Sequence, residues 1–348
     1  MFRRDFFART LCSPSENAAG IYGDMNSSAT APRGDELFLA VEIGGTKLQV
    51  VAGTGAGKIR ERAKFSVDVK AGAEGIRDIL GKTVPEFLQR WQVRAIGVGF
   101  GGPVNWRAGR IAKSHHVSGW DEFAIGDWLA AISKRRVFVE NDANVAALGE
   151  TMCGAGRGFN PVFYVTIGSG VGGGLVCDGA IYHGAAPGEA EIGYLILDAE
   201  GNITEKHCSG WSLDKKIREA VAAQPSGELA RRCAESPGHE ARHLGAALAA
   251  DDPLAEKILD AHARMLSLAL SHVTHLFHPE IIVLGGGVSL IGEPLRAAVE
   301  SRLRERVMDA FRPGPRVALS SLREDAVPVG ALCLAAGELE RVMGIEPT

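Results

Sequence analysis

The feature that most constrains the fold is a pair of similar segments, each made of an apolar run, a glycine-containing turn and a second apolar run. In residues 37–52 the runs LFLAVEI and LQVVA flank a Gly-Gly-Thr-Lys turn, and in residues 162–177 the run VFYVTI precedes a Gly-Ser-Gly turn. Apolar runs joined by a short glycine turn predict a β-hairpin. Because further helical and strand patterns follow each hairpin, we predict two similar α/β units. Helices are predicted at residues 73–92, 123–134, 143–153 and 253–277, and further strands at residues 94–100, 136–140 and 281–284.

The order of these segments divides the chain into domains. Residues 37–153 and 154–328 are predicted to form two α/β domains facing a central cleft, with the helix predicted at about 329–343 packing back on the first domain. Residues 1–36 are rich in Ser, Ala, Gly and Asp without a sustained period, so we expect a disordered polar tail there. Arg3-Arg4 in this tail is similar to the start of a twin-arginine export signal, but polar residues follow where such a signal needs an apolar segment.

Composition and charge exclude several classes of function. The 348 residues include 46% apolar and 23% charged residues, as in soluble globular proteins. A formal net charge of -4 provides no basic excess for a phosphate backbone, so no nucleic-acid partner is expected. No segment reaches the length of a membrane span, so no membrane partner is expected either. The six cysteines are scattered without a CxxC pair, which indicates reduced thiols and a cytoplasmic location.

The first glycine turn has the residue types of a phosphate-binding loop, with Glu42, Gly44, Gly45, Thr46 and Lys47 close together. Glycines allow backbone N–H groups to approach phosphate oxygens, and Thr46 adds a hydroxyl donor. The carboxylate of Glu42 can hold Mg²⁺ directly or through water. A plain hairpin turn is the alternative, and on this segment alone it is the better interpretation.

Two further glycine clusters follow apolar strands. Thr166, Gly168, Ser169 and Gly170 belong to a stretch with five glycines in seven residues. Close approach to an anionic ligand explains that stretch better than packing does, because glycine weakens a strand. The cluster Gly285-Gly286-Gly287 follows a predicted strand, where bare backbone can admit a flat ligand. A simple strand-to-helix turn is a fair alternative for this third cluster.

Asp142 is the candidate general base. It lies next to Asn141 where a predicted strand meets a predicted helix, and helix capping is the commoner role for Asp at such a place. Phosphoryl transfer to an alcohol needs a carboxylate that accepts the hydroxyl proton and donors that hold the acceptor, and these two adjacent residues supply both. The acidic segment at residues 188–194 offers further carboxylates for hydroxyl groups, with a solvated acidic loop as the alternative.

Taken in order, these motifs resemble those of the ROK family of sugar kinases and sugar-responsive repressors, within the actin-like ATPase and hexokinase superfamily. The resemblance extends from about Leu37 to Gly337, and its specificity comes from six motifs in family order: EIGGTK, GFGGPV, ENDANVAALGE, TIGSGVGGGL, GEAEIGY and LGGGVS. It implies two actin-like ATPase (ribonuclease H-like) domains, ATP with Mg²⁺ as cofactors, a hexose or amino-sugar acceptor, and a homodimer.

The resemblance also implies roles for individual residues. Asp142 matches the catalytic base, the first two glycine turns match phosphate loops, and the third cluster matches an adenosine-binding segment. The implied cofactor-binding residues are Glu42, Gly44, Gly45, Thr46, Lys47, Thr166, Gly168, Ser169, Gly170, Gly285, Gly286 and Gly287. The implied substrate-binding residues are Gly102, Asn141, Asp142, Glu191, Tyr194 and Asp214.

Three features depart from the family pattern. Glu42 replaces the usual Asp, and Tyr194 replaces a His that contacts sugar and binds a structural zinc. The third departure is the zinc loop, which is reduced to His207-Cys208 and cannot complete a tetrahedral site, so we expect no structural zinc. Trp211 is predicted to fill the space by packing. Asp214 falls where the family has a sugar-binding Glu.

The resulting prediction is an ATP-dependent hexose kinase, with phosphorylation of glucose to glucose 6-phosphate as the leading reaction. Two alternatives stay open. One is a sugar-binding sensor that has lost catalysis, suggested by Glu42, Tyr194 and the missing zinc loop, and the other is a kinase that uses polyphosphate as the donor. A repressor is disfavoured, because a short polar tail stands where the family's repressors have a helix-turn-helix domain.

Overall fold

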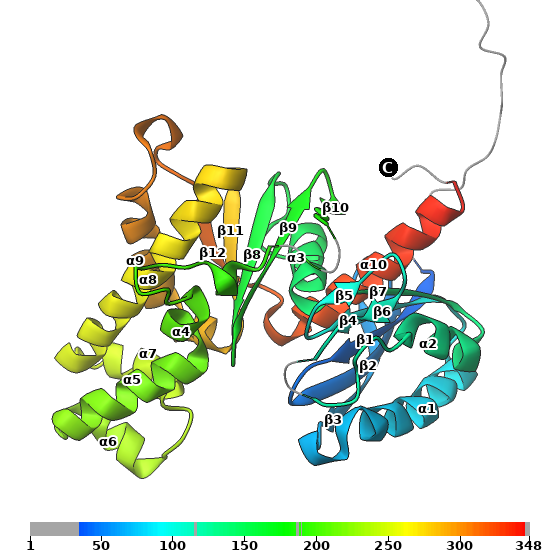
Figure 1. Cartoon of the computed structure of the whole chain (residues 1–348), viewed down its shortest axis with the longest axis horizontal. Coiled ribbons are helices and arrows are strands. Elements are labelled where there is room, and N and C mark those ends of the chain that lie inside the picture. Colours follow the sequence, from blue (N-terminus) through cyan, green and yellow to red (C-terminus); the bar gives the residue numbers. More distant parts are fainter. Residues whose placement is uncertain (1–34, 115–116, 186–187, 189, 345–348) are drawn as a thin grey trace, which may run out of the picture. The chain divides into compact units, whose positions relative to one another are not determined.

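The structure is built around two five-stranded sheets (Figure 1). It is a computed structural model that describes residues 35–114, 117–185, 188 and 190–344. The first sheet has the order β3-β2-β1-β4-β7, and the second has the order β10-β9-β8-β11-β12. The strands are β1 (Leu37–Ile43), β2 (Lys47–Thr54), β3 (Ile59–Ser66), β4 (Val93–Phe100), β5 (Val104–Asn105), β6 (Arg110–Ile111), β7 (Arg136–Asn141), β8 (Val162–Ile167), β9 (Val171–Cys177), β10 (Ala180–Ile181), β11 (Ile281–Gly285) and β12 (Arg316–Leu319).

The two sheets have the same topology. In the first sheet, β1 and β2 form an antiparallel hairpin, and β4 and β7 continue the sheet parallel to β1. In the second sheet, β8 and β9 form the hairpin, and β11 and β12 continue parallel to β8. The predicted pair of glycine-turn hairpins and the predicted α/β class are therefore confirmed.

Every helix predicted from the sequence is present, and its ends differ from the prediction by at most three residues. Helices α4, α6 and α7 have too few residues to produce a periodic pattern, so sequence periodicity does not reveal them. The helices are α1 (Gly72–Arg90), α2 (Ile125–Ser133), α3 (Asp142–Cys153), α4 (Thr204–Cys208), α5 (Gly210–Ala223), α6 (Glu228–Glu235), α7 (Leu244–Leu248), α8 (Pro253–Phe277), α9 (Glu293–Arg304) and α10 (Ala326–Val342).

The central strands are buried on both faces, because alternate residues enter different hydrophobic cores. In β1, Leu39, Val41 and Ile43 pack into a core shared with α1 and α2, whereas Phe38 and Ala40 enter another core. The core that contains Phe38 also holds residues of β8, β11, α3 and α10. The odd-numbered residues of β8 pack into a third core with α5, α8 and α9. One core is therefore common to residues of both sheets.

Helices α3 and α10 cross in backbone contact. A Cβ built on Gly149 would lie 2.6 Å from Ala326 O and 2.9 Å from Gly330 N, so neither crossing glycine has room for a side chain. Helix α10 also packs against β1 and β4, and α3 packs against β8 and β9. Because α3 contacts elements of both sheets, the domain boundary placed after residue 153 stays a prediction.

The predicted tail at residues 1–36 lies almost entirely outside the described residues. At its end, the Glu36 carboxylate is 2.6 Å from Arg94 Nη1, so the chain is already held against β4 one residue before β1 begins. Within the part of the chain that the structure describes, no helix combines the length and apolar character needed to span a bilayer.

Candidate active site

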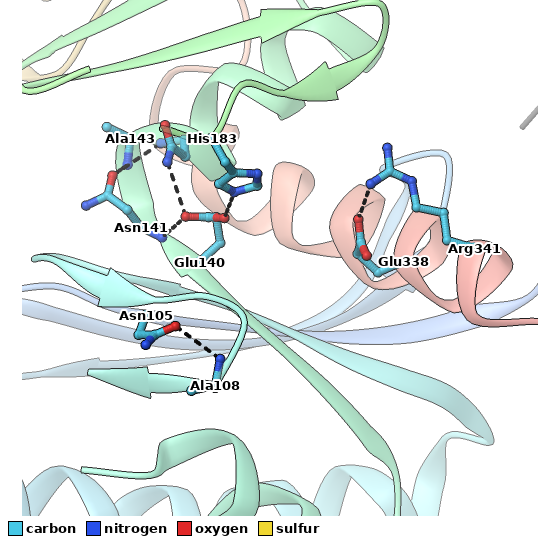
Figure 2. Close-up of polar contacts among 9 residues, drawn as sticks. Asn105, Ala108, Glu140, Asn141, Ala143, His183, Glu338 and Arg341 are labelled. Atoms are coloured by element: carbon cyan, nitrogen blue, oxygen red, sulfur yellow. Dashed lines mark hydrogen bonds and ion pairs between the residues drawn. The ribbon is translucent and has the colours of Figure 1, made fainter. Parts of the chain in front are cut away.

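Asn141 and Asp142 lie at the junction of β7 and α3, and it is Asn141 that caps the helix. Asn141 Oδ1 accepts hydrogen bonds from Ala143 N at 2.9 Å and from Asn144 N at 3.3 Å (Figure 2). Its Nδ2 donates to Gly102 O at 3.1 Å. Asp142 is the first residue inside α3. The capping role considered for Asp142 is therefore filled by its neighbour, and the Asp142 carboxylate is not needed for it.

The Asp142 carboxyl group has an unusually high affinity for a proton. Loss of hydration, with smaller contributions from the negative charges of Glu42 and Glu191, raises its pKa to about 7, while the N–H group of Ala143 acts in the opposite direction. A Cβ built on Gly101 would lie 3.3 Å from Asp142 Oδ2, so the GFGGPV turn approaches this carboxylate through a glycine. A carboxylate with a pKa near neutrality is suited to accept a proton from a hydroxyl group.

A small pocket lies beside this junction. Its cavity volume is about 10 Å³, and two of the predicted sugar-binding residues, Asn141 and Glu191, line it together. Carboxylate and amide groups in one pocket offer acceptors and donors for vicinal hydroxyl groups. The complete set of lining residues is Pro103, Val104, Glu140, Asn141, Asn144, Gly188 and Glu191.

Gly102 and Asp142 are next to lining residues in the sequence but are not among them, and two further predicted sugar-binding residues, Tyr194 and Asp214, also do not line this pocket. Tyr194 is 58% exposed and ends a 3-10 helix, Ile192–Tyr194. Asp214 is buried in α5, where its Oδ1 accepts a hydrogen bond from Ala241 N at 2.8 Å. Asp214 therefore bonds the backbone at Ala241 and is not one of the residues that line the pocket. A sugar-binding role for either residue stays a prediction.

Glu140 is a buried carboxylate of the pocket wall that the sequence prediction omits. Its Oε1 accepts hydrogen bonds from Asn141 N at 2.7 Å and Asn144 Nδ2 at 3.1 Å, and its Oε2 lies 2.6 Å from His183 Nε2 (Figure 2). His183 stacks on Trp106 with ring centroids 4.0 Å apart. Glu140 thus connects the β7–α3 junction to the segment that follows β10. A charged residue at the end of an apolar strand is the sequence signal that identifies such a group.

The first glycine turn is closed by contacts within its own hairpin. Gly44 N donates to Lys47 O at 2.9 Å, and Lys47 Nζ is 2.8 Å from Glu42 Oε1. Gln49 Nε2 donates to Glu42 Oε2 at 2.6 Å. Burial raises the pKa of Glu42, although Lys47 and Gln49 oppose the shift. Both Glu42 oxygens therefore have protein partners, which suits Mg²⁺ held through water better than a direct metal bond.

The second and third glycine clusters lie next to each other. Thr166 is paired with Gly285 in the register of β8 and β11. Gly286 has φ +78°, and a Cβ there would lie 2.6 Å from backbone atoms of Ile167. Gly286 is therefore required by its backbone conformation and by close packing. A 3-10 helix, Gly287–Ile291, begins directly after it, so the strand-to-helix turn considered from the sequence is also present.

Glu205 reaches the second glycine turn from α4. Its Oε2 accepts a hydrogen bond from Val171 N at 3.0 Å, and a Cβ built on Gly170 would collide with the same oxygen. Gly210 N donates to Gly168 O at 2.7 Å from the other side. The sequence prediction misses Glu205, because an acidic residue in the first turn of a short helix is ordinary and nothing local links it to the glycines.

Comparison with known proteins identifies the family. The model described as the ROK family matches residues 38–338. This chain belongs to the ROK family. It is 29% identical to a glucokinase of Thermotoga maritima over 84% of this chain and 95% of that protein. The crystal structure of a ROK family glucokinase from Streptomyces griseus, in complex with glucose and AMPPNP, is 29% identical with a TM-score of 0.76, covering 86% of this chain and 99% of that chain.

Another relative shows the range of substrates among proteins similar to this ROK chain. A β-glucoside kinase of Listeria innocua is 28% identical over 72% of this chain and 82% of that protein. These comparisons, with the paired sheets, confirm the predicted actin-like ATPase fold.

The region of the reduced zinc loop differs from the sequence prediction in one respect. Trp211 is 60% exposed, so the prediction that it fills the space of the missing loop by packing is wrong. Cys208 is fully buried in the core of the second sheet, and His207 Nε2 lies 3.4 Å from Asp198 Oδ2. Among the described residues, no group of three or more His, Cys, Asp and Glu side chains is placed to hold a metal. The absence of a structural zinc stays a prediction.

Proposed function

We propose that this ROK-family chain is an ATP-dependent sugar kinase that transfers a phosphoryl group to a hexose, with glucose as the leading acceptor. The observation that carries the proposal is the Asp142 carboxyl group. Asn141, and not Asp142, is the N-cap of α3. The Asp142 carboxyl group follows a residue that lines a pocket with hydroxyl-binding groups, and its pKa is raised to about 7. The glucokinases that are similar to this chain support glucose as the acceptor.

In the proposed reaction, Asn141 and Glu191 orient the sugar in the pocket, and Asp142 accepts the proton of the attacking hydroxyl group. The N–H groups of the first two glycine turns that are not bonded within the turns, as those of Gly44 and Gly168 are, bind the phosphates of ATP. Mg²⁺, when bound, would neutralise charge on the phosphoryl oxygens, and Glu42 is the residue that would hold it, through water. The buried Glu140 keeps the β7–α3 junction fixed through its bonds to Asn141 and Asn144.

The decisive experiment combines a sugar panel with one substitution. We expect sugar-dependent release of ADP from ATP by the unaltered chain, and we expect Asp142→Asn to lower kcat by roughly 100- to 10,000-fold, because general-base catalysis contributes about that much. Sugar binding, measured by calorimetry, should persist in the variant. Asp127→Asn is the matched control, because Asp127 is an exposed acid in the first turn of α2 and should leave kcat unchanged. Near-normal turnover by Asp142→Asn would refute its role as the base.

A sugar-binding sensor is the second candidate function. It is supported by the Glu42 carboxylate, whose two oxygens are taken by Lys47 and Gln49, and by the exposure of Tyr194. Saturable binding of a sugar without ADP release across the panel would favour the sensor. Running the same panel with polyphosphate in place of ATP tests the third alternative, and β-glucosides and N-acetylated amino sugars belong in the panel. Size-exclusion chromatography with light scattering tests the proposed homodimer, and cell fractionation tests the proposed cytoplasmic location.

A further inference from the structure

Two cysteines face each other where α3 packs on α10. The Sγ atoms of Cys153 and Cys333 are 3.7 Å apart, although the residues are separated by 180 positions in the sequence. The contact follows from the helix crossing. Gly149 and Gly330 bring the two backbones together, and each cysteine lies one helical turn beyond one of these glycines. Neighbouring side chains on those faces must therefore meet.

The two thiols have different surroundings. Cys153 is the last residue of α3 and is partly exposed, with Ala56 O 3.4 Å from its sulfur, whereas Cys333 is buried. The hydrogen bond between Cys153 and Cys333 lowers the pKa of Cys153, burial opposes this shift, and the positive charge of Arg157 supports it. The same contact raises the pKa of Cys333. Cys153 is thus the more accessible thiol, and its lowered pKa favours the thiolate there, with the buried Cys333 thiol beside it; these are the two roles that thiol oxidation needs.

We propose that Cys153 and Cys333 form a redox-active pair, which a hydroperoxide oxidises to a disulfide joining α3 to α10. In the first step, the Cys153 thiolate attacks the terminal peroxide oxygen, the O–O bond breaks, and the leaving oxygen takes up a proton to become an alcohol or water. Cys153 is then a sulfenic acid. In the second step, the Cys333 sulfur attacks the Cys153 sulfur, the S–O bond breaks, and hydroxide leaves and combines with the Cys333 proton as water. The dithiol loses two electrons and one peroxide gains them.

Little movement is needed for the second step. The sulfurs must approach from 3.7 Å to about 2 Å for the bond to form. The bond would close a loop of 180 positions in the sequence, so it would restrict the unfolded chain strongly. Helix α3 begins at Asp142, and α3 and α10 both contribute to the core common to the two sheets. The disulfide would therefore also restrain the packing of α3, the helix that carries Asp142.

The test uses the full chain, reduced and then treated with hydrogen peroxide in stoichiometric amounts. We expect the number of thiols titrated after denaturation to fall from six to four, with a non-reducing digest giving one peptide that links Cys153 to Cys333. Dithiothreitol should restore all thiols. The melting temperature of the oxidised chain should be higher than that of the reduced chain by about 3 °C or more, because the disulfide restricts the unfolded state.

Single substitutions separate this pair from the other cysteines. Cys153→Ser and Cys333→Ala should each abolish the linked peptide and the rise in melting temperature. Cys177→Ser is the matched control, because Cys177 is another partly exposed thiol, and it should retain both effects. A linked peptide that joins different cysteines, a loss of thiols that dithiothreitol does not reverse, or an oxidised chain that melts at a lower temperature would each overturn the proposal.

Discussion

The two glycine turns occupy equivalent places in sheets of the same topology, but different contacts hold them. In the first turn, the contacts come from the hairpin itself, where Glu42 is bonded to Lys47 and Gln49. In the second turn, Val171 N donates to Glu205, which is 34 positions away, and α5 contributes a further bond to the backbone of the turn. The first turn is local and the second is assembled from separate segments.

This difference concerns both charge and space. The first turn buries a carboxylate that a lysine compensates, so changes of charge should affect it most. At the second turn, Gly170 packs against the Glu205 carboxylate and the adjacent Gly286 packs against the backbone of Ile167, so an added methyl group at these two glycines should have the largest effect. Identical topology therefore fixes where the turns lie, while the side chains around each turn decide what it tolerates.

The largest effect is expected from Gly286→Ala. The new Cβ would lie 2.6 Å from the backbone of Ile167, and φ +78° is unfavourable for alanine, so we expect a loss of roughly 4 kcal/mol in the free energy of unfolding. Urea unfolding measures this loss. Gly168→Ala is the matched control, because no atom lies within 4 Å of a Cβ built there, and it should cost less than about 1 kcal/mol. Equal losses in the two variants would contradict the steric account of this region.

A second prediction concerns Asp142, whose pKa responds to the charge of the first turn through Glu42. The pKa of Asp142 is about 7 in the folded chain, whereas its ordinary value is 3.8. Between pH 4 and pH 7 the folded chain therefore keeps a proton on Asp142 that the unfolded chain has lost. Stability therefore falls as pH rises from 4 to 7. Asp142→Asn removes this penalty, and its gain in unfolding free energy should grow from near zero at pH 4 to roughly 3 kcal/mol above pH 7, after allowance for partial exposure.

The pKa of Asp142 also distinguishes the two turns, because it responds to the charge of Glu42 in the first turn. Glu42→Gln should lower the pKa of Asp142, because it removes a neighbouring negative charge, whereas Glu205→Gln should leave that pKa nearly unchanged. Urea unfolding at several pH values gives the pKa in each variant. A stability gain for Asp142→Asn that does not depend on pH would show that burial and Glu42 do not raise the pKa of this carboxyl group.

The sequence alone predicts the parts of this molecule that depend on neighbouring residues. The two hairpins follow from apolar runs and glycine turns, and the pairing of Asn141 with Asp142 is visible because the two are adjacent. The sequence leaves open which of the two caps α3. That choice depends on the backbone angles of Asn141, which is extended, and on the helical position of Asp142, and neither can be read from residue types.

Long-range contacts explain what the sequence prediction missed. Glu205 meets the second glycine turn across 34 positions, and His183 meets Glu140 across 43 positions. Neither pair has a spacing that a periodic pattern could reveal, because the contacts depend on how separate elements pack. The prediction for Trp211 was wrong for a related reason, because the 60% exposure of its ring depends on how separate elements pack, which residue types do not reveal.

A third prediction tests the role of charge in the first turn. Lys47→Met removes the ammonium group that compensates the buried Glu42 carboxylate and leaves it the hydrogen bond from Gln49. The free energy of unfolding should therefore fall by about 1–2 kcal/mol at pH 8, a value reduced by the partial exposure of Lys47. Removing Lys47 raises the pKa of Glu42 further, so the loss should shrink as pH falls and Glu42 becomes protonated. The double variant Lys47→Met with Glu42→Gln should recover most of the loss, and no recovery would mean that Lys47 acts through packing instead.

The smallest effect is expected at the second turn, where the hydrogen bond of Glu205 matters more than its charge. Glu205→Gln keeps an oxygen that can accept from Val171 N, so its unfolding free energy should stay within about 0.5 kcal/mol of the unaltered chain. Glu205→Ala removes the acceptor and should cost about 1 kcal/mol. Thermal and urea unfolding of the two variants, at matched pH, measure the difference. If Gln proved as costly as Ala, the second turn would depend on charge as the first does, and the contrast between the two turns would be lost.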